Sequence, residues 1–268
     1  MKTVLTIAGS DCSGGAGIQA DIKTITMHHC YAMSVITALT AQNTTGVYGI
    51  EQTSDDLIAN QLDCVFTDIF PDAVKIGMVY GNNSAKVIAD KLNFYKAKNI
   101  VTDPVMVSTS GSRLISEQGL ENLKKYLLPI SSLVTPNVPE AEILSGINIK
   151  NLQDMQNAAK IISDKYGCAV LCKGGHLEDC SDDLLYSDGE FYTYHSLRID
   201  NPNTHGTGCT LSSAIASNLA KGFAITPAVV NAKAYVTKAI SVKLDLGNGR
   251  GPLMHNYILN EIRKADEI

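Results

Sequence analysis

The feature that most constrains this chain is a regular alternation between two hydrophobic patterns. Short runs rich in Val and Ile, typical of buried strands, are separated by longer stretches in which apolar residues recur every three or four positions, as in helices packed on a sheet. The strand candidates are residues 3–8, 35–39, 73–76, 99–102, 133–135 and 169–172. The helix candidates are residues 18–27, 55–70, 85–95, 118–127, 153–166, 209–221 and 227–244. Serial strand–helix–strand units build a mostly parallel sheet covered by helices, so we predict an α/β fold, a three-layer α/β/α sandwich.

One segment departs from this alternation. Residues 183–194 alternate with period two around Asp188 and Gly189. This pattern is a strong signal for a β-hairpin, which we place at an edge of the sheet. The sequence contains no internal repeat, low-complexity tract or long Pro- or Ser-rich linker. We therefore expect residues 1–268 to form a single domain, because α/β folds commonly reach this size as one unit.

Charge and composition exclude several classes of function. The chain has 22 Lys and Arg against 27 Asp and Glu, a formal net charge of −5, so no basic excess is available to bind a nucleic-acid backbone. No apolar run approaches the ~20 residues that cross a bilayer, and the N-terminus reads as a first strand and not as a secretory signal. We expect no membrane partner and a cytoplasmic location. The 7 cysteines are scattered without a CxxC pair, as in reduced intracellular proteins.

The residues that follow the strand candidates are where chemistry is expected, because ligands of open parallel sheets bind beyond the carboxyl ends of the strands. These positions hold glycines, carboxylates and one lysine. They are Gly9-Ser10-Asp11 with Ser13 to Gly17, Gln42-Asn43, Gly77-Met78, Asp103-Pro104, Pro136-Asn137 with Glu140, Lys173-Gly174-Gly175, and His205 to Thr210.

The strongest single motif is His205-Gly206-Thr207-Gly208-Cys209-Thr210, which precedes an apolar helical run. Glycines let backbone N–H groups approach a ligand, and a helix N-terminus presents unpaired N–H groups, so the motif predicts an anion site. The alternative is a tight turn that only begins a helix. The pKa of a thiol at a helix N-terminus can fall from ~8.5 toward neutrality, which makes Cys209 a candidate base or nucleophile. The alternative is a small buried hydrophobic side chain. This second role is the one expected for Cys12, Cys30, Cys64, Cys168, Cys172 and Cys180.

A second glycine-rich turn, Ser13-Gly14-Gly15-Ala16-Gly17, precedes the helix candidate at residues 18–27. It lacks the spacing of a dinucleotide fingerprint or of a Walker A loop. It still suits a close approach of the backbone to a ligand. Asp21 lies one turn into this helix, where it belongs to the ligand site or is a solvated carboxylate that favours the helix N-terminus.

Carboxylates and one lysine follow the later strands. Asp103, and Asn137 with Glu140, are candidates to hold Mg²⁺ through oxygen atoms or water, because magnesium usually takes one or two carboxylates beside substrate phosphates. Alternatively, Asn137 and Glu140 begin a helix with Pro139 in its first turn, and the two roles are compatible. Lys173 is a candidate phosphate contact or a solvated loop lysine.

Taken together, the motifs resemble those of a known family. They are Ala8 to Asp11 with Ser13 to Asp21, Thr40 to Thr44, Lys75 to Met78, Asp103 to Met106, Thr135 to Ala141, Lys173 to His176 and His205 to Thr210. In this order, from the first strand to the last helices, they are similar to the motifs of the hydroxymethylpyrimidine/phosphomethylpyrimidine kinases of thiamine biosynthesis, in the ribokinase-like superfamily. The resemblance implies a ribokinase-like fold and a homodimer.

The resemblance also implies an activity and a role for each motif. The activity is ATP- and Mg²⁺-dependent phosphorylation of 4-amino-5-hydroxymethyl-2-methylpyrimidine and then of its monophosphate to the diphosphate. Cys209 would be the base, and the amides of Gly206, Thr207 and Gly208 would form the anion hole. The pyrimidine pocket would consist of Gly9, Asp21, Gln42, Met78 and Val105. The nucleotide phosphates and the metal would be served by Asp103, Asn137, Glu140, Lys173 and Thr207, with Asp103 and Glu140 as metal ligands.

Three other functions stay open. A pyridoxine/pyridoxal kinase is the nearest alternative, because some similar enzymes have Gly-Ala-Gly-Cys where this chain has Gly-Thr-Gly-Cys. Gln42 favours the pyrimidine, since its amide donates and accepts at once, as an aminopyrimidine edge requires. In a different class, Cys209 would be the nucleophile of an acyl transferase with His205 as its base. A nucleotide-binding module without turnover is the third.

The segment Gly247 to Pro252 resembles a family segment near the nucleotide, but Arg250 departs from it.

Overall fold

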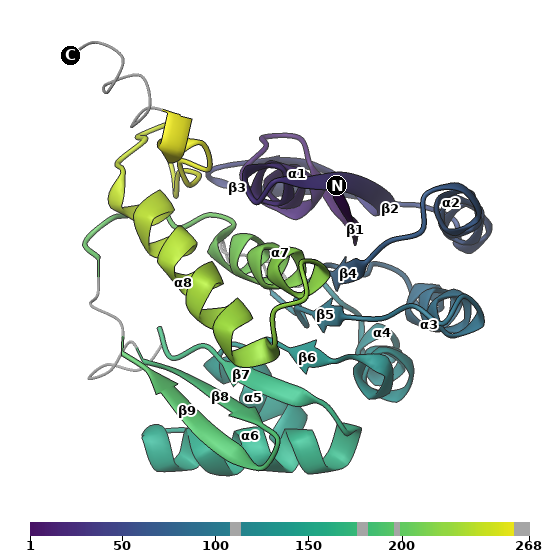
Figure 1. The fold of residues 1–268 in the computed structure, drawn as a ribbon. Helices are drawn as coiled ribbons and strands as arrows, with labels where there is room; N and C mark the ends of the chain where they lie inside the picture. The colour runs from purple at the N-terminus through teal and green to yellow at the C-terminus, as the bar shows by residue number, and fades with distance from the viewer. Residues whose placement is uncertain (108–113, 176–181, 196–198, 260–268) are drawn as a thin grey trace.

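The computed structural model describes residues 1–107, 114–175, 182–195 and 199–259, and its strands form one sheet (Figure 1). The order of the strands across the sheet is β3-β2-β1-β4-β5-β6-β7-β8-β9. The central strands run parallel, whereas β3, β8 and β9 pair antiparallel at the two edges. The strands are β1 (Lys2–Asp11), β2 (Cys30–Asn43), β3 (Gly46–Gln52), β4 (Ala73–Ile76), β5 (Ile100–Thr102), β6 (Leu133–Val134), β7 (Ala169–Cys172), β8 (Asp183–Ser187) and β9 (Glu190–Tyr194).

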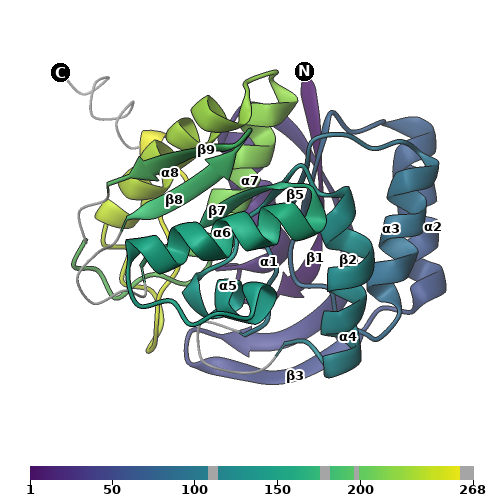
Figure 2. The same ribbon diagram turned by 90° about the horizontal axis from the view of Figure 1, so that it is seen from below.

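Helices cover both faces of the sheet. They are α1 (Gly17–Met27), α2 (Asp55–Asp68), α3 (Ser84–Phe94), α4 (Glu117–Asn122), α5 (Val138–Ser145), α6 (Leu152–Tyr166), α7 (Thr207–Ala220) and α8 (Ile225–Ser241). Figures 1 and 2 show α1, α7 and α8 on one face and α2, α3 and α6 on the other. The predicted three-layer α/β/α sandwich with a mostly parallel sheet is therefore confirmed.

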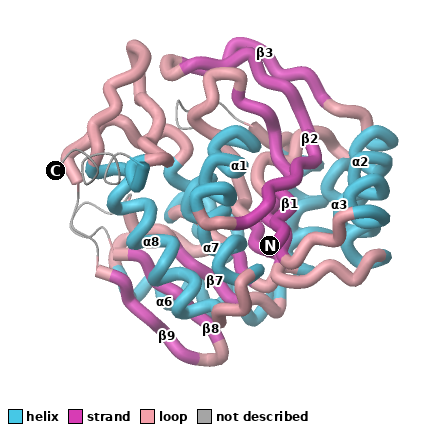
Figure 3. The backbone as a smooth tube through the Cα atoms, turned by 45° about the horizontal axis from the view of Figure 1, so that its top comes forward, coloured by secondary structure: helices cyan, strands magenta, loops and turns pink. Residues whose placement is uncertain are grey.

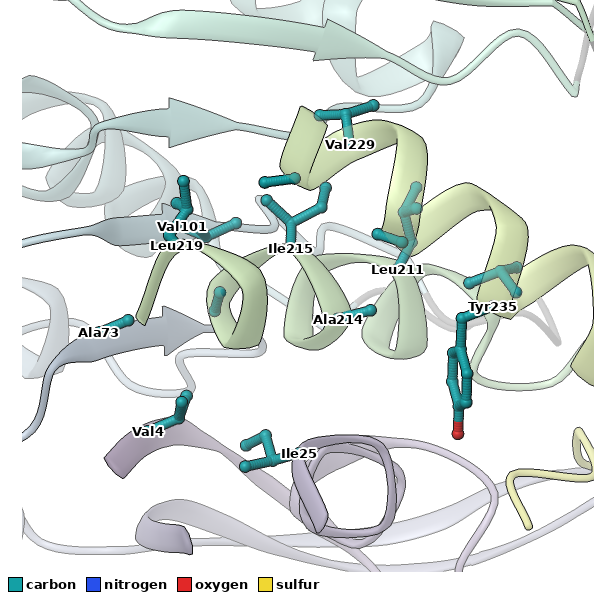
Figure 4. Close-up of a cluster of buried hydrophobic side chains, with 14 of the residues drawn as sticks. Val4, Ile25, Ala73, Val101, Leu211, Ala214, Ile215, Leu219, Val229 and Tyr235 are labelled. Carbon is teal, nitrogen blue, oxygen red and sulfur yellow. The ribbon is translucent and has the colours of Figure 1, made fainter. Parts of the chain in front are cut away.

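The core follows from the alternation of side chains along each strand. Val4 packs with Ile25 of α1 and with side chains of α7 and α8 (Figure 4), whereas Leu5 faces the cluster built by α2 and α3. Helix α7 is buried from Thr210 to Ala220. The helix that begins at the glycine motif is thus fixed in the middle of the core, which gives its N-terminus a defined position.

Each edge of the sheet is formed by a hairpin, of which one was predicted from the sequence and the other was not. The predicted hairpin is present as β8 and β9, with Asp188 and Gly189 at φ values of 53° and 82° in its turn. Strand β3 is not among the strand candidates, and it pairs with the far end of β2 to form a second edge hairpin, which projects from the sheet in Figure 3. All of its residues are exposed or half-buried, so the apolar alternation that reveals a strand is missing.

Two further differences concern helices and thiols. The candidate at residues 118–127 is α4 followed by a π-helical turn at Leu123–Leu127, and the helix that Asn137 and Glu140 could begin is present as α5. The buried role predicted for the cysteines is confirmed for Cys30, Cys168 and Cys172, but it is wrong for Cys12 and Cys64, which are exposed; Cys180 lies outside the described residues. Within the described ranges, none of the helices has the length and apolar character needed to cross a membrane.

The strand order fixes where a ligand can bind. Strand β1 lies between β2 and β4, so the chain moves to one side of β1 first and to the other side afterwards. Such a change of direction opens a crevice at the carboxyl ends of the strands, and ligands of open α/β sheets bind there. The residues that end β1, β4 and β5 meet at this point, and α7 starts beside them.

Candidate active site

The N-terminus of α7 is locked against the glycine turn formed by residues 13–17. Gly206, at φ 82°, lies on the backbone of Gly15, and any side chain at 206 would collide with the Gly15 carbonyl oxygen. A side chain at Gly15 would in turn collide with the ring of His205. Glycine is thus required at both positions because of the close approach, and at 206 also because of the positive φ. We call residues 206–209 the anion loop.

The anion loop contains three amides that have no acceptor within the described part of the chain. The amide of Thr207 already donates to Thr204 O at 3.2 Å, and that of Thr210 donates to Gly206 O at 2.9 Å. Among the described residues, the amides of Gly206, Gly208 and Cys209 have no hydrogen-bond acceptor. The first turn of a helix carries unpaired donors and partial positive charge, so these three amides are the candidate donors to an anion. The structure thereby differs from the expectation that the Thr207 amide belongs to the hole.

The thiol of Cys209 has a higher pKa than the sequence suggested. It is half-buried at the first turn of α7. Burial raises the pKa of Cys209 to about 11, and the opposing effects of the Lys75 ammonium and of a hydrogen bond from the Gly17 backbone do not compensate for it. The expected fall toward neutrality is therefore wrong. The helix N-terminus favours a thiolate, but the loss of water around the sulfur dominates.

Asp21 is not the solvated carboxylate of the alternative reading. Its side chain is completely buried, and Oδ2 accepts hydrogen bonds from Lys75 Nζ at 2.7 Å and from Thr6 Oγ1 at 2.6 Å. Oδ1 accepts from Ser213 Oγ of α7 at 2.7 Å. Ser213 lies one turn after Cys209 on α7, so the carboxylate connects β1, α1, β4 and α7 beneath the anion loop. Lys75 had no role assigned from the sequence.

Asp103 and Lys173 form a charged pair beside the anion loop. Lys173 Nζ donates to Asp103 Oδ1 at 2.8 Å, and Thr135 donates to the same oxygen. A side chain at Gly208 would come within 3.1 Å of Asp103 Oδ2 and 3.4 Å of Lys173 Nζ. Burial lowers the pKa of Lys173, but the carboxylates of Asp103 and Glu140 outweigh it and raise that pKa. A lysine held in the charged form at this position is suited to contact a phosphate.

Glu140 and Asn137 begin α5 as the sequence analysis allowed. Asn137 Oδ1 accepts from the Glu140 amide at 2.9 Å, and Glu140 Oε2 accepts from the Asn137 amide at 2.8 Å, with Pro139 in the first turn. This is a capping box. Burial raises the pKa of Glu140 to about 7, against the attraction of Lys173. A buried carboxylate that is poorly stabilised in its charged form would gain from a nearby cation.

Three of the residues predicted to contact the pyrimidine, Gly9, Met78 and Val105, lie together in the structure. Met78, at the end of β4, packs in a small apolar cluster with Ala38 and Leu114, and Val105 borders that cluster. A side chain at Gly9 would collide with Met78 Cε, which lies 2.5 Å from the position of its Cβ. The structure thus brings together an apolar floor from strands that are far apart in the sequence.

Gln42 lies near the end of β2, beside His205. Its Oε1 accepts from Thr40 Oγ1 at 3.3 Å, and its Nε2 lies 3.2 Å from His205 Nε2. His205 Nε2 also lies 2.8 Å from Asp11 Oδ2. Burial favours a higher pKa for Asp11, but hydrogen bonds from His205, Ser13 and Ala16 outweigh it and lower that pKa. The imidazole of His205 is thus bound to a carboxylate and not placed as a base for Cys209. Asp11 had no role assigned from the sequence.

The segment from Gly247 to Pro252 closes the site from the C-terminal side. Arg250 N donates to Thr44 O in the turn between β2 and β3, and His205 N donates to Gly251 O. Side chains at Gly247 and Gly249 would collide with Thr44. The segment therefore ties the second edge hairpin to the residue that precedes the anion loop, while the Arg250 side chain is exposed.

The chain is similar to known proteins over most of its length. The family model described as phosphomethylpyrimidine kinase matches residues 11–254. The hydroxymethylpyrimidine/phosphomethylpyrimidine kinase of Haemophilus influenzae is 43% identical over 260 residues, which cover 95% of this chain and 97% of that protein. The thiamine biosynthesis bifunctional protein ThiED of Geobacter sulfurreducens is 47% identical over 262 residues, or 97% of this chain, and this chain spans 54% of its length.

A solved structure extends the likeness to the fold. The ADP complex of Bacillus subtilis pyridoxal kinase superimposes with a TM-score of 0.88 at 36% identity, over 97% of this chain and 99% of that chain. The family match covers most of the chain, and the relative from H. influenzae matches it over nearly its full length. On these grounds the chain belongs to the phosphomethylpyrimidine kinase family.

Proposed function

We propose that this chain is an ATP-dependent kinase that phosphorylates the hydroxyl group of 4-amino-5-hydroxymethyl-2-methylpyrimidine and then converts the monophosphate to the diphosphate. The observation that carries the proposal is the corner at the start of α7. There the three unpaired amides of the anion loop, the Cys209 thiol and the Asp103–Lys173 pair lie side by side. These groups are the anion donors, the proton acceptor and the cation that phosphoryl transfer needs.

The anion loop and Lys173 do most of the chemical work in this mechanism. Phosphoryl transfer passes through a loose transition state in which charge lies on the oxygens of the migrating group, so catalysis comes mainly from positioning and electrostatic stabilisation. The unpaired amides of the anion loop stabilise that charge without moving, because α7 is fixed in the core. Lys173 neutralises phosphate oxygens on the side of Asp103.

Cys209 receives the proton of the acceptor hydroxyl. A thiol with a pKa of about 11 is mostly protonated at neutral pH. A loose transition state needs little removal of the proton before the phosphoryl group moves, so the proton leaves late and a small thiolate fraction is sufficient. For the second phosphorylation the acceptor is a phosphate oxygen, which is already ionised and depends less on the thiol.

Magnesium would be held by Asp103 and Glu140. Asp103 lies beside Gly208 of the anion loop, and the carboxylates of Asp103 and Glu140 interact electrostatically, while burial raises the pKa of Glu140 to about 7. The oxygen donors fit an ion that takes one or two carboxylates and completes its shell with water and phosphate. When bound, Mg²⁺ would supply positive charge to the phosphate oxygens. Asn137 would position Glu140 through the capping box. Thr207 would lie beside the nucleotide phosphates, with its hydroxyl held by Thr204 O at 2.8 Å.

The aminopyrimidine would lie on the apolar floor of Met78 and Val105, with Gly9 beneath the ring and the Gln42 amide at its edge. The carboxamide donates and accepts at once, which matches the ring nitrogen and amino group of an aminopyrimidine. Asp21 supports this pocket from below through its buried hydrogen bonds and does not reach a ligand itself.

A pyridoxal kinase is the second candidate, because the fold superimposes closely on that of the B. subtilis pyridoxal kinase. The test is the initial rate of ADP release with the pyrimidine alcohol, its monophosphate and pyridoxal, measured side by side. Higher kcat/KM for the two pyrimidines supports the proposal. A preference for pyridoxal assigns the chain to the second candidate, and no ADP with any of the three refutes both.

We propose further that residues 1–268 work as one catalytic domain, as a homodimer, in the cytoplasm and without a nucleic-acid partner. The continuous sheet and the net charge of −5 support the first and the last of these statements. The dimer rests on the family resemblance. Sedimentation of the purified chain tests it, with one species of twice the mass of 28.7 kDa expected.

A further inference from the structure

The carboxylate of Asp11 joins the glycine turn to the residue that precedes the anion loop. It lies at the end of β1 and is 3% exposed. Oδ1 accepts from the Ser13 amide at 2.9 Å and from Ser13 Oγ at 2.7 Å. Oδ2 accepts from the amides of Gly15 at 3.2 Å and Ala16 at 2.9 Å, and from His205 Nε2 at 2.8 Å. Five donors thus converge on one buried carboxylate, which is the strongest arrangement for an acceptor that carries charge.

We propose that Asp11 is a positioning residue of the phosphoryl-transfer site and that it acts through His205 on both the anion loop and Gln42. The proposal rests on the kinase function proposed above and assigns a role to two residues that this function had not used. Asp11 holds no reacting group. Its effect reaches the anion loop through the backbone and Gln42 through the imidazole.

The first effect is mechanical. The imidazole of His205 lies against the Cα of Gly15, and Gly206 lies against the Gly15 carbonyl group. His205 N also donates to Gly251 O at 3.1 Å. The ring is thus held by Gly15 and the backbone of His205 by Gly251, and Asp11 supplies the polar contact of the ring on the side of the glycine turn. If this contact is lost, the ring and the adjoining Gly206 shift together, and the amides of the anion loop shift with them.

The second effect concerns the proton on His205 Nε2. This nitrogen lies 2.8 Å from Asp11 Oδ2 and 3.2 Å from Gln42 Nε2. An ionised carboxylate only accepts hydrogen bonds, so the bond to Asp11 requires a proton on Nε2. A protonated nitrogen has no lone pair left for the amide N–H of Gln42. Asp11 thereby prevents His205 from capturing the Gln42 amide, which stays available to the edge of a ligand.

The variant Asp11→Asn removes both effects with little change in shape. Its NH₂ group would face N–H donors, and His205 would be free to take the other tautomer and accept from Gln42 Nε2. We expect kcat/KM for the pyrimidine alcohol to fall about 10- to 100-fold, the loss that follows from removing a charge-assisted hydrogen bond. The fall should be shared between a lower kcat and a higher KM for the pyrimidine, with the KM for ATP unchanged within about twofold.

The matched control is Asp72→Asn. Asp72 accepts from Thr3 N at 2.9 Å and from Lys2 Nζ at 2.7 Å. Its carboxylate therefore lies beside the first residues of β1, whereas Asp11 is the last residue of that strand. The kinetic constants of Asp72→Asn should stay within about twofold of those of the unmodified chain. Unchanged kinetics in Asp11→Asn, or equal losses in the two variants, would overturn the proposal.

Two substitutions of His205 separate the hydrogen bond from simple packing, even if Asp11→Asn folds poorly. His205→Gln keeps an N–H donor near the position of Nε2, whereas His205→Leu keeps bulk and no donor. We expect His205→Gln to retain at least about tenfold more kcat/KM than His205→Leu. Equal losses would show that the ring acts only by filling space, which contradicts the proposal.

A spectroscopic measurement separates this proposal from the kinase function. In the ¹⁵N-histidine spectrum of the ligand-free protein, His205, identified by its loss in His205→Gln, should show a protonated Nε2. In Asp11→Asn the proton should move to Nδ1. A tautomer that does not change overturns the role of Asp11, whatever the activity. Absence of ADP release by the unmodified chain, with the tautomer shift present, would instead refute the kinase function.

Discussion

Lys75 and Asp21 form an ion pair beneath the anion loop, with 2.7 Å between Nζ and Oδ2 and both side chains 0% exposed. They come from β4 and α1, which are neighbours only in the folded chain. Taking two charges out of water is costly, and the pair persists because Thr6 and Ser213 complete the hydrogen bonds of the carboxylate. The pair gives the floor of the site its rigidity.

The first prediction concerns this pair. Lys75→Met leaves a buried carboxylate without its partner, so we expect it to lower the free energy of unfolding by about 3–5 kcal/mol. The double variant Lys75→Met/Asp21→Asn removes both charges and should lose clearly less than the sum of the single variants. Urea denaturation measures all three. Lys86→Met, which breaks the exposed pair with Asp90, is the control and should change little. Additive losses would contradict the role of the pair.

The second prediction concerns Cys209. We expect Cys209→Ala to reduce kcat about 10²- to 10⁴-fold, the usual contribution of a group that takes a proton, with the KM for ATP unchanged. Steady-state kinetics with the pyrimidine alcohol measure both constants. Cys64→Ala, at an exposed thiol of α2, should behave as the unmodified chain. Turnover close to normal in Cys209→Ala would show that the thiol only packs.

The third prediction is the pH dependence of kcat. Burial raises the pKa of Cys209 to about 11, so the thiolate fraction grows about tenfold for each pH unit between 7 and 9. If the thiolate takes the proton, kcat for the first phosphorylation increases over this range. The slope should be smaller for the monophosphate, whose acceptor oxygen is already ionised. A kcat for the alcohol that does not depend on pH would argue against the thiolate.

The fourth prediction links Glu140 to stability. Burial raises the pKa of Glu140 from 4.5 to about 7, so the folded state binds its proton more tightly than the unfolded state. The contribution of Glu140 to the free energy of unfolding is fully present below its pKa in the unfolded state, about 4.5. It is lost as the pH rises from about 4.5 to about 7, and the total loss is about 3 kcal/mol. Glu140→Gln keeps the capping box and does not titrate. In buffer without metal, the unfolding free energy of Glu140→Gln, relative to that of the unmodified chain, should increase between pH 5 and pH 8.

The same substitution should act in the opposite direction on activity, because it removes an oxygen donor proposed for the metal. Glu140→Gln is expected to need more Mg²⁺ for half-maximal rate. Parallel pH profiles of stability in the two chains would contradict the assigned pKa. An unchanged magnesium requirement would remove Glu140 from the metal site.

The fifth prediction concerns recognition of the pyrimidine. Gln42→Leu should raise the KM for the pyrimidine alcohol about tenfold or more, since the hydrogen bonds at its edge are lost and its polar groups are left unpaired. The KM for ATP should not change. Gln118→Leu, on the exposed surface of α4, is the control. Equal increases in both Michaelis constants would place Gln42 outside the substrate pocket.

The layers of the fold follow from the sequence because strands buried on both faces, such as β4 and β7, are short apolar runs flanked by glycines and turns. Strand β3 could not be predicted from the sequence, because it lies at an edge with water on both sides and needs no apolar pattern. The hairpin of β8 and β9 could be predicted because its turn residues, Asp188 and Gly189, specify it directly.

The positions of the site residues could be predicted from the sequence, but their ion pairs and pKa shifts could not. The strand order brings Gly77, Asp103 and the anion loop to one edge, as the rule for parallel sheets requires. The state of Asp21 could not be inferred from its place at a helix N-terminus, because its partner Lys75 is 54 residues away. The prediction that the pKa of Cys209 is lowered was wrong for a related reason. A helix N-terminus is visible in the sequence, whereas the burial that opposes it depends on the whole fold.

The most direct test of the central claim is ³¹P NMR of the reaction of ATP with the pyrimidine alcohol. The account predicts a new phosphate monoester that forms with ADP and is then replaced by the two coupled resonances of a diphosphate. Release of inorganic phosphate alone, with no phosphorylated pyrimidine, would contradict it.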